Sequence, residues 1–288
     1  MGLRFGFVMP FGDAADVAAA AVAAEQAGWQ AIFAWEPVWG VDAWVALTAA
    51  AERTSHLRVG TMLTPLPRVR PWDLASRAGT LDRLSGGRVQ LAVGLGALHE
   101  GWTAFETDQG RRTRVELLEE GLAVYDGLMR GQPFAFEGKH HTVRPTDFCV
   151  PPPPVQQPRV PVWVVGAYVQ GRAAQPSVER AARWDGLVPH FLRADQEQVE
   201  PEHRFAPEEL ATMVQLARAV RDAAGLPWEG YDVVFEGRSH GAGATPQPPS
   251  VWAAAGATWW LEGAWDLSDD APGRVELARR IAAGPPVG

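Results

Sequence analysis

Cysteine is scarce in this sequence, and long apolar runs are absent. The 288 residues include one cysteine, Cys149, which excludes an internal disulfide and gives no sign of an oxidising compartment. A membrane-spanning helix needs about 18 consecutive apolar residues, and no such run occurs. The first residues, MGLRFGFVMP, lack the regions of a signal peptide. We therefore expect a cytoplasmic protein with no membrane partner, in which Cys149 is partly buried and inert.

Positive charge is also in short supply. Lys and Arg total 26 against 34 for Asp and Glu, which gives a formal net charge of −8. A general nucleic-acid binder needs a basic surface to replace the counterions of the phosphates, so this balance argues against a nucleic-acid partner. A local basic pocket for a small anionic ligand remains compatible with an acidic protein.

The most informative feature present is a regular alternation of two segment types. Short apolar runs rich in Val, Phe, Leu and Trp alternate with longer, Ala-rich segments of helical period. The apolar runs predict strands over 4–9, 30–35, 57–63, 88–95, 160–166, 186–191, 231–236 and 258–262. The longer segments predict helices over 13–27, 42–54, 71–84, 111–130, 177–183, 207–224 and 274–283, with a short helix near 250–255.

This alternation predicts one α/β domain over residues 1–288, a (β/α)8 TIM barrel. Strict alternation with short links indicates a parallel sheet, and eight units close into a barrel. The alternation is interrupted over 131–159. There the hairpin-like FAFEGKHHTV and the proline-rich PPPPVQQP form an excursion between the fourth and fifth strand–helix units. A doubly wound open sheet is the alternative, but no G-x-G-x-x-G opens the first helix.

The fold directs the search for a site to the loops after the strands. In 63–70, two prolines stiffen the chain beside Arg68 and Arg70, which suit an anionic group, although solvent-facing arginines explain the pattern as well. In 94–102, Gly94 and Gly96 allow close approach to a planar ring, or form a plain turn. In 166–175, a glycine followed by a helix start suits a phosphate.

Histidines and tryptophans also follow the predicted strands. His99, His190 and His240 lie past strands four, six and seven, yet no H-x-H or H-E-x-x-H spacing occurs, so no metal site is assigned. The sequence has 13 tryptophans, most of which we expect in the core. Trp35, Trp39 and Trp265 follow strand ends and are candidates for an aromatic wall.

Three segments together resemble the luciferase-like monooxygenase family, the bacterial luciferase-like oxidoreductases that depend on flavin or coenzyme F-420. The first is PLPRVRPWDLASRAGTLDRLSGGRVQLAVGLG at 65–96, and the second is RVELLEEGLAVYDGLMRGQPFAFEGKHHTV at 114–143. The third is PPPPVQQPRVPVWVVGA followed by ERAARWDGLVP, within 151–189. The resemblance covers most of the chain from Leu3 to Ala264, and 192–250 agree only loosely.

The resemblance implies a TIM barrel that binds reduced FMN or F-420 with its ring against the ends of strands three and four. It places Leu63 and Thr64 at a strand-three bulge, where the family often holds a non-prolyl cis peptide under the ring. It places Gly94 and Gly96 beside the ring. Gly166 and Ala167 match the phosphate side, although the family's VGG is VVGA here and the N–H of Ala167 is left to replace a glycine's. Apart from the resemblance, Ser177 is a candidate either to cap the following helix or to bind the anion.

The family shares no single catalytic residue, because the cofactor carries the chemistry. Glu36 and His99 are the candidates for substrate contact, with Glu36 in proton transfer or in a structural role. The resemblance implies an oxidoreductase, monooxygenase or dehydrogenase, acting on an unidentified small molecule, and a homodimer. The alternatives are a non-catalytic flavin-binding relative and a metal-dependent TIM-barrel hydrolase.

Two features of the sequence, its charge and its composition, bear on the choice between FMN and F-420. F-420 has a polyanionic tail, for which Arg68, Arg70, Arg172 or Arg193 would supply a basic channel. The alanine- and arginine-rich composition is typical of actinobacterial proteins, among which F-420 is common, and it slightly favours F-420.

Overall fold

The computed structural model describes residues 2–97, 101–193, 206–241 and 244–286. Its strands form a closed barrel in the order β1-β10-β9-β8-β7-β4-β3-β2. The pairs β1–β10, β10–β9, β9–β8, β8–β7 and β4–β3 are all parallel. This order confirms the predicted (β/α)8 barrel. None of the helices in the described ranges combines the length and apolarity needed to cross a bilayer.

The chain divides into two compact units. Unit 1 comprises Met1–Phe11, Ala23–Ile32 and Val162–Gly288, and unit 2 comprises Gly12–Val22 and Phe33–Pro161. Helix α1 (Ala14–Gln26) and strand β2 (Ala31–Ala34) are divided between the two.

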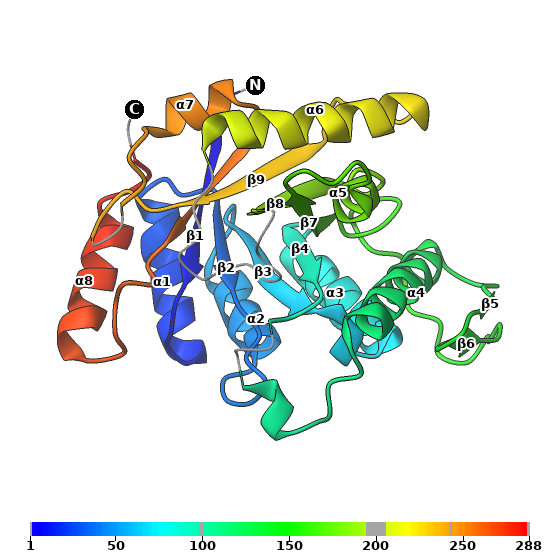
Figure 1. Cartoon of the computed structure of the whole chain (residues 1–288). Helices are drawn as coiled ribbons and strands as arrows, with labels where there is room; N and C mark the ends of the chain where they lie inside the picture. Colours follow the sequence, from blue (N-terminus) through cyan, green and yellow to red (C-terminus); the bar gives the residue numbers. More distant parts are fainter. Residues whose placement is uncertain (1, 98–100, 194–205, 242–243, 287–288) are drawn as a thin grey trace. The chain divides into compact units, whose positions relative to one another are not determined.

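Unit 1 holds β1 and the barrel strands β7 to β10 with the helices that follow those four strands. Its strands are β1 (Arg4–Met9), β7 (Val162–Val169), β8 (Gly186–Leu192), β9 (Asp232–Gly237) and β10 (Trp259–Gly263). Its helices are α5 (Pro176–Ala181), α6 (Pro207–Ala223), α7 (Pro249–Ala254) and α8 (Ala271–Ala282). Helices α6 and α7 lie beside one another along one side of β8 and β9 (Figure 1).

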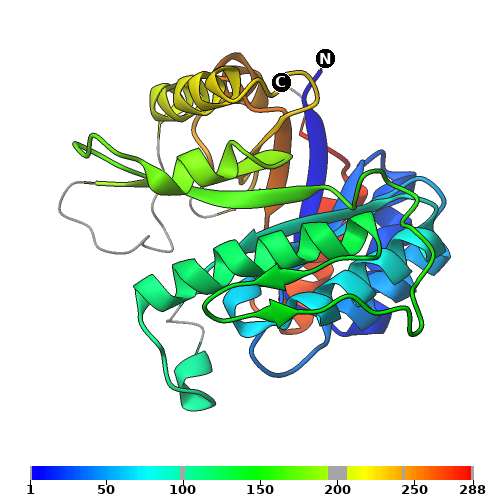
Figure 2. The same cartoon turned by 90° about the vertical axis from the view of Figure 1, so that its right-hand side faces the viewer.

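Unit 2 holds the remaining strands and the excursion. Its strands are β3 (Arg58–Pro65) and β4 (Val89–Gly94) with the two-residue strands β5 (Phe136–Glu137) and β6 (Thr142–Val143). Its helices are α2 (Ala43–Arg53), α3 (Pro71–Ser85) and α4 (Arg111–Arg130), with 3-10 turns η1 (Leu66–Arg68) and η3 (Trp102–Ala104). The hairpin of β5 and β6 runs beside α4, where the Glu120 carboxylate accepts the N–H groups of Lys139, His140 and His141 (Figure 2).

The local sequence explains where the elements begin and end. The Asp42 side chain accepts the N–H groups of Trp44 and Val45 and so starts α2, while proline in the first turn starts α3. All residues of β2 and β4 are buried, as expected for parallel strands covered on both faces. One expectation is wrong: Cys149 is exposed, because the proline-rich excursion carries it over the surface.

The excursion is fastened to α3 by a single buried carboxylate. Asp82 is fully buried, and its Oδ2 accepts the N–H groups of Val155 at 2.7 Å and Gln156 at 3.0 Å. Its Oδ1 accepts Nε2 of Gln156 at 2.7 Å. The segment around Asp82 is therefore structural.

We expect Asp82→Ala to lower the free energy of unfolding by about 2–4 kcal/mol, because it leaves buried donors without an acceptor. The neighbouring Arg83→Ala removes two exposed bonds, from Nη1 to the carbonyl of Pro152 and from Nη2 to the hydroxyl of Thr80, and serves as the matched control. We expect that control to cost less than about 1 kcal/mol. Urea unfolding measures both, and equal losses would contradict the role given to Asp82.

Candidate functional site

Glu36 lies in unit 2, separated from the end of β2 by Trp35, and is half-buried. Its Oε1 accepts the indole N–H of Trp44 at 3.1 Å and the hydroxyl of Thr64. Burial raises the pKa of this carboxyl, while the two hydrogen bonds and the charge of Arg77 lower it by less. The site therefore favours the protonated form of Glu36 over a wider pH range than water does.

The hydroxyl that donates to Glu36 belongs to a short chain of contacts. Thr64 Oγ1 lies 3.0 Å from Thr61 Oγ1, which lies 3.3 Å from the carbonyl oxygen of Ala92. These contacts fix the position of the Thr64 hydroxyl beside Glu36. The bond from Thr64 favours the ionised carboxyl, but burial favours the neutral one by more.

Strand β3 contains the bulge that the resemblance placed there. The β3–β4 register shifts between Thr61 and Thr64, and the peptide bond Met62–Leu63 is cis. Leu63 is half-buried, whereas Met62 and Thr64 are buried. Leu63 is therefore the side chain of this bulge that a ligand can reach, while the hydroxyl of Thr64 is engaged with Glu36.

The turn after β4 is tightly packed against the end of β3. Gly96 has a φ of +76°, and a Cβ added there would lie 2.9 Å from Cβ of Pro65. Only glycine therefore fits without moving β3. Gly94, the last residue of β4, is buried.

A cluster behind this turn holds its carbonyl groups. Nη1 of Arg114 donates to the carbonyl of Gly96 at 3.3 Å, and the indole of Trp102 donates to the carbonyl of Ala97 at 2.7 Å. The guanidinium groups of Arg68 and Arg114 lie 4.7 and 5.7 Å from the Trp102 ring centre. The turn is thus held in place by side chains of its own unit.

In unit 1, Gly166 is explained by helix packing. A Cβ at Gly166 would lie 2.3 Å from Cδ1 of Leu187 and 3.2 Å from Cα of Val178 in α5. The absence of a side chain at Gly166 makes room for α5. Helix packing alone therefore explains why this position is a glycine.

Ala167 and Ser177 contact one another. The N–H of Ala167 donates to Oγ of Ser177 at 3.0 Å, so the expectation that this N–H is left for a phosphate is wrong for this conformation. Helix α5 begins at Pro176, which has no N–H, and carries Glu179 in its first turn. The donors at this helix start therefore suit an anion less well than the sequence suggested.

The candidate histidines do not form a metal site in the described ranges. His99 lies outside the described residues, so its predicted contact with substrate stays a prediction. His190 is on β8 and His240 follows β9. No group of three or more His, Cys, Asp or Glu side chains among the described residues is arranged to hold a metal ion.

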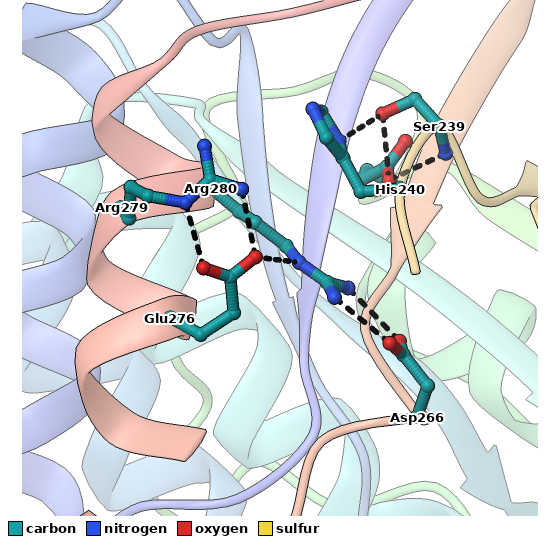
Figure 3. Close-up of polar contacts among 7 residues, drawn as sticks. Ser239, His240, Asp266, Glu276, Arg279 and Arg280 are labelled. Atoms are coloured by element: carbon teal, nitrogen blue, oxygen red, sulfur yellow. Dashed lines mark hydrogen bonds and ion pairs between the residues drawn. The ribbon is translucent and has the colours of Figure 1, made fainter. Parts of the chain in front are cut away.

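Sequence reasoning missed a polar network after β9 and β10. Glu262 Oε1 accepts the N–H and hydroxyl of Ser239 at 2.7 and 2.9 Å, and the same hydroxyl lies 2.7 Å from Nδ1 of His240 (Figure 3). Arg280 donates to both oxygens of Asp266, at 2.9 and 2.8 Å. These bonds fasten the loop after β9 to the segments around β10 and α8.

The sequence does hold a signal for the carboxylates of these two strands. Glu236 in VVFEG and Glu262 in WWLEG are acidic residues that interrupt apolar strands near their ends. A carboxylate in such a place needs a specific partner or a function.

The comparisons with known proteins give the class of this chain. The sequence profile of the family described as luciferase-like monooxygenase matches residues 4–204. The chain therefore belongs to the luciferase-like monooxygenase family, as its sequence segments indicated.

Three solved structures share its fold. The monooxygenase RslO1 from Streptomyces bottropensis is 20% identical, with a TM-score of 0.73 over 97% of this chain and 96% of that one. An F420-dependent secondary alcohol dehydrogenase, in complex with an F420-acetone adduct, is 16% identical, with a TM-score of 0.75 over 99% and 100%. The coenzyme F420-dependent tetrahydromethanopterin reductase from Methanopyrus kandleri is 15% identical, with a TM-score of 0.72 over 96% and 97%.

The raised pKa of Glu36 predicts how stability depends on pH. The folded state holds the proton more tightly than the unfolded state, whose pKa is near 4.5. The free energy of unfolding therefore falls as pH rises from about 4.5 towards the raised pKa, by up to about 1.4 kcal/mol per pH unit. Glu36→Gln cannot ionise at this position, so we expect its free energy of unfolding to rise relative to that of the wild type over this window, in urea unfolding from pH 2 to 8.

Glu116→Gln is the control of opposite sign. Hydrogen bonds from Lys139 and His140 lower the pKa of Glu116 to about 2. The contribution of Glu116 to stability is therefore present above pH 4.5 and is lost as pH falls towards 2. The free energy of unfolding of Glu116→Gln consequently rises relative to that of the wild type only in acid. A Glu36→Gln difference that does not change with pH would contradict the account of Glu36.

Proposed function

We propose that this chain binds FMN or coenzyme F-420 and uses it as an oxidoreductase on a small organic substrate. The observation that carries the proposal is the family match over residues 4–204, which includes β1 to β4, β7 and β8. When bound, the cofactor would supply hydride transfer or oxygen chemistry, and the protein would bind it, orient it and shape the pocket.

The ring-side segment of unit 2 fits a planar cofactor. Leu63 offers an accessible apolar side chain at the bulge, and Gly94 and Gly96 offer backbone without side chains at the end of the next strand. Thr64 would act through its neighbour, by holding Glu36, and not by touching the ring. The packing of Gly96 on Pro65 would fix the spacing between these two strand ends.

For the phosphate side, we retain Gly166, Ala167 and Ser177 as the candidate segment. The hydroxyl of Ser177 and the N–H of Ala167 are both within this turn, and they bond to one another in the present conformation. A phosphate held here would accept bonds from the two groups in place of that contact.

Glu36 is our candidate for proton exchange with the substrate, together with His99. The neutral carboxyl that its surroundings favour is a donor, so it would protonate or hydrogen-bond an oxygen of the substrate. Its bonds to Thr64 and Trp44 would fix its position. The predicted homodimer and cytoplasmic location stay predictions.

The full-length alignments with two F420-dependent enzymes support F-420, whereas charge does not. The F420-dependent alcohol dehydrogenase and reductase align with this chain over almost their whole lengths. A channel for a polyanionic tail needs available cations, yet Arg68 pairs with Glu106, Arg70 with Asp73 and Arg193 with Glu209. Arg172 is exposed and remains the best candidate among the four predicted arginines.

The proposal is tested by titrating the protein with FMN and with F-420 and following tryptophan quenching. We expect saturable binding of one of them in the micromolar range or tighter, and a loss of at least about tenfold in Gly96→Ala, because the new Cβ displaces Pro65. Gly101→Ala is the matched control, because Gly101 has a similar φ of +78° but nothing within 4 Å of an added Cβ.

The control separates backbone strain from displacement of β3. Equal losses in the two variants would contradict the ring-side assignment. Failure of the wild type to bind either cofactor would contradict the proposed function itself.

A further inference from the structure

Glu236 is an exposed carboxyl near the end of β9 in unit 1. Its neighbour Phe235 stacks on Trp252 of α7, with ring centres 3.6 Å apart and planes 13° from parallel. Side chains alternate along a strand, so Glu236 points to the face of β9 away from α7. In a parallel barrel this is a strand end of the kind that carries reacting groups.

One oxygen of Glu236 is fixed and the other is available. The indole N–H of Trp265 donates to Oε1 at 2.5 Å. A Cβ at Gly263 would lie 2.9 Å from that Oε1 and 3.0 Å from Nε1 of Trp265, so the missing side chain leaves room for the bond. Oε2 has no hydrogen-bond partner among the described residues, which leaves it open to a ligand.

The other strand carboxylates of unit 1 differ from Glu236 in this respect. Glu262 is buried, with Oε1 bonded to Ser239 and Oε2 to the indole of Trp260 at 2.9 Å. Asp232 is buried, with Oδ2 accepting Trp163 at 3.1 Å and Oδ1 bonded to Arg4 and Thr258. Bonds to protein groups therefore account for both oxygens of Glu262 and of Asp232, but for only one oxygen of Glu236.

The surroundings of Glu236 favour a bound proton. Although solvent reaches the side chain, protein atoms crowd around it, and this loss of bulk water raises its pKa. The bond from Trp265 and the charge of Arg238 lower the pKa, and the charge of Glu262 raises it. Arg238 and Glu262 are the charged groups that act on it.

We propose that Glu236 is a proton-transfer residue, which exchanges a proton through Oε2 with the oxygen of a hydroxyl or carbonyl substrate at the ends of β9 and β10. This inference rests on the proposed function. In the oxidation of an alcohol, the bound cofactor would accept the hydrogen of the C–H bond together with its electron pair, as hydride. The O–H proton passes to Glu236, and a C=O bond forms. In the reverse direction, Glu236 returns the proton to the carbonyl oxygen.

The first test needs neither cofactor nor substrate. In protein labelled with ¹³C at the glutamate carboxyl, the NMR signal that disappears in Glu236→Gln belongs to Glu236. We expect its midpoint above the ordinary value of 4.5, and a further rise in Trp265→Phe, because that variant removes a bond to the ionised form. A midpoint at or below 4.5 would overturn the proposal.

The second test is turnover of secondary alcohols and ketones by the protein loaded with the cofactor that it binds. We expect Glu236→Gln to lower kcat by about 100-fold or more with KM little changed, and to remove the limb of the pH profile that belongs to Glu236. Glu262→Gln is the control, expected to lower stability but to keep that limb.

The outcomes separate this inference from the proposed function. Failure of the wild type to bind FMN or F-420 removes the proposed function. Cofactor binding with no turnover of any alcohol or ketone overturns the inference alone, because it excludes the substrate class. Full turnover with an unchanged pH profile in Glu236→Gln does the same.

Discussion

Parallel strand pairing is the constraint on which the rest of this structure depends. It buries both faces of the barrel strands, so a carboxylate on or beside a strand must find hydrogen-bond donors or keep its proton. Asp232 and Glu262 meet this constraint with donors on both oxygens. Glu36 and Glu236 meet it only in part, and the pKa of each is raised.

Glu36 and Glu236, the two incompletely bonded carboxyls, share three structural features. Each follows or ends a strand, each accepts one tryptophan N–H, and each sits where protein atoms replace bulk water. Tryptophan fixes such a carboxyl without bringing a positive charge, which would hold it ionised. The outcome is a positioned proton donor, which suits chemistry in which a cofactor moves electrons and the protein moves protons.

The sequence predicted the fold almost completely, because apolar strands and Ala-rich helices alternate with clear start and stop residues. Asp42, Pro71 and Gly86 set ends within a residue or two of the prediction. The site was predicted less well. Gly166 looked like a ligand-approach glycine, but it makes room for α5, and that distinction depends on which way a Cβ would point. Glu236 went unnoticed because the Trp265 bond joins residues 29 positions apart.

Family membership and the geometry of β3 and β4 together make one central claim: a flavin-type cofactor lies against the ends of these two strands. Amide hydrogen exchange measured with and without the bound cofactor tests it most directly. The account predicts slower exchange in peptides that cover residues 61–66 and 93–97, and unchanged exchange in the hairpin at 136–143. Saturable binding that leaves exchange at 61–66 and 93–97 unchanged would contradict it.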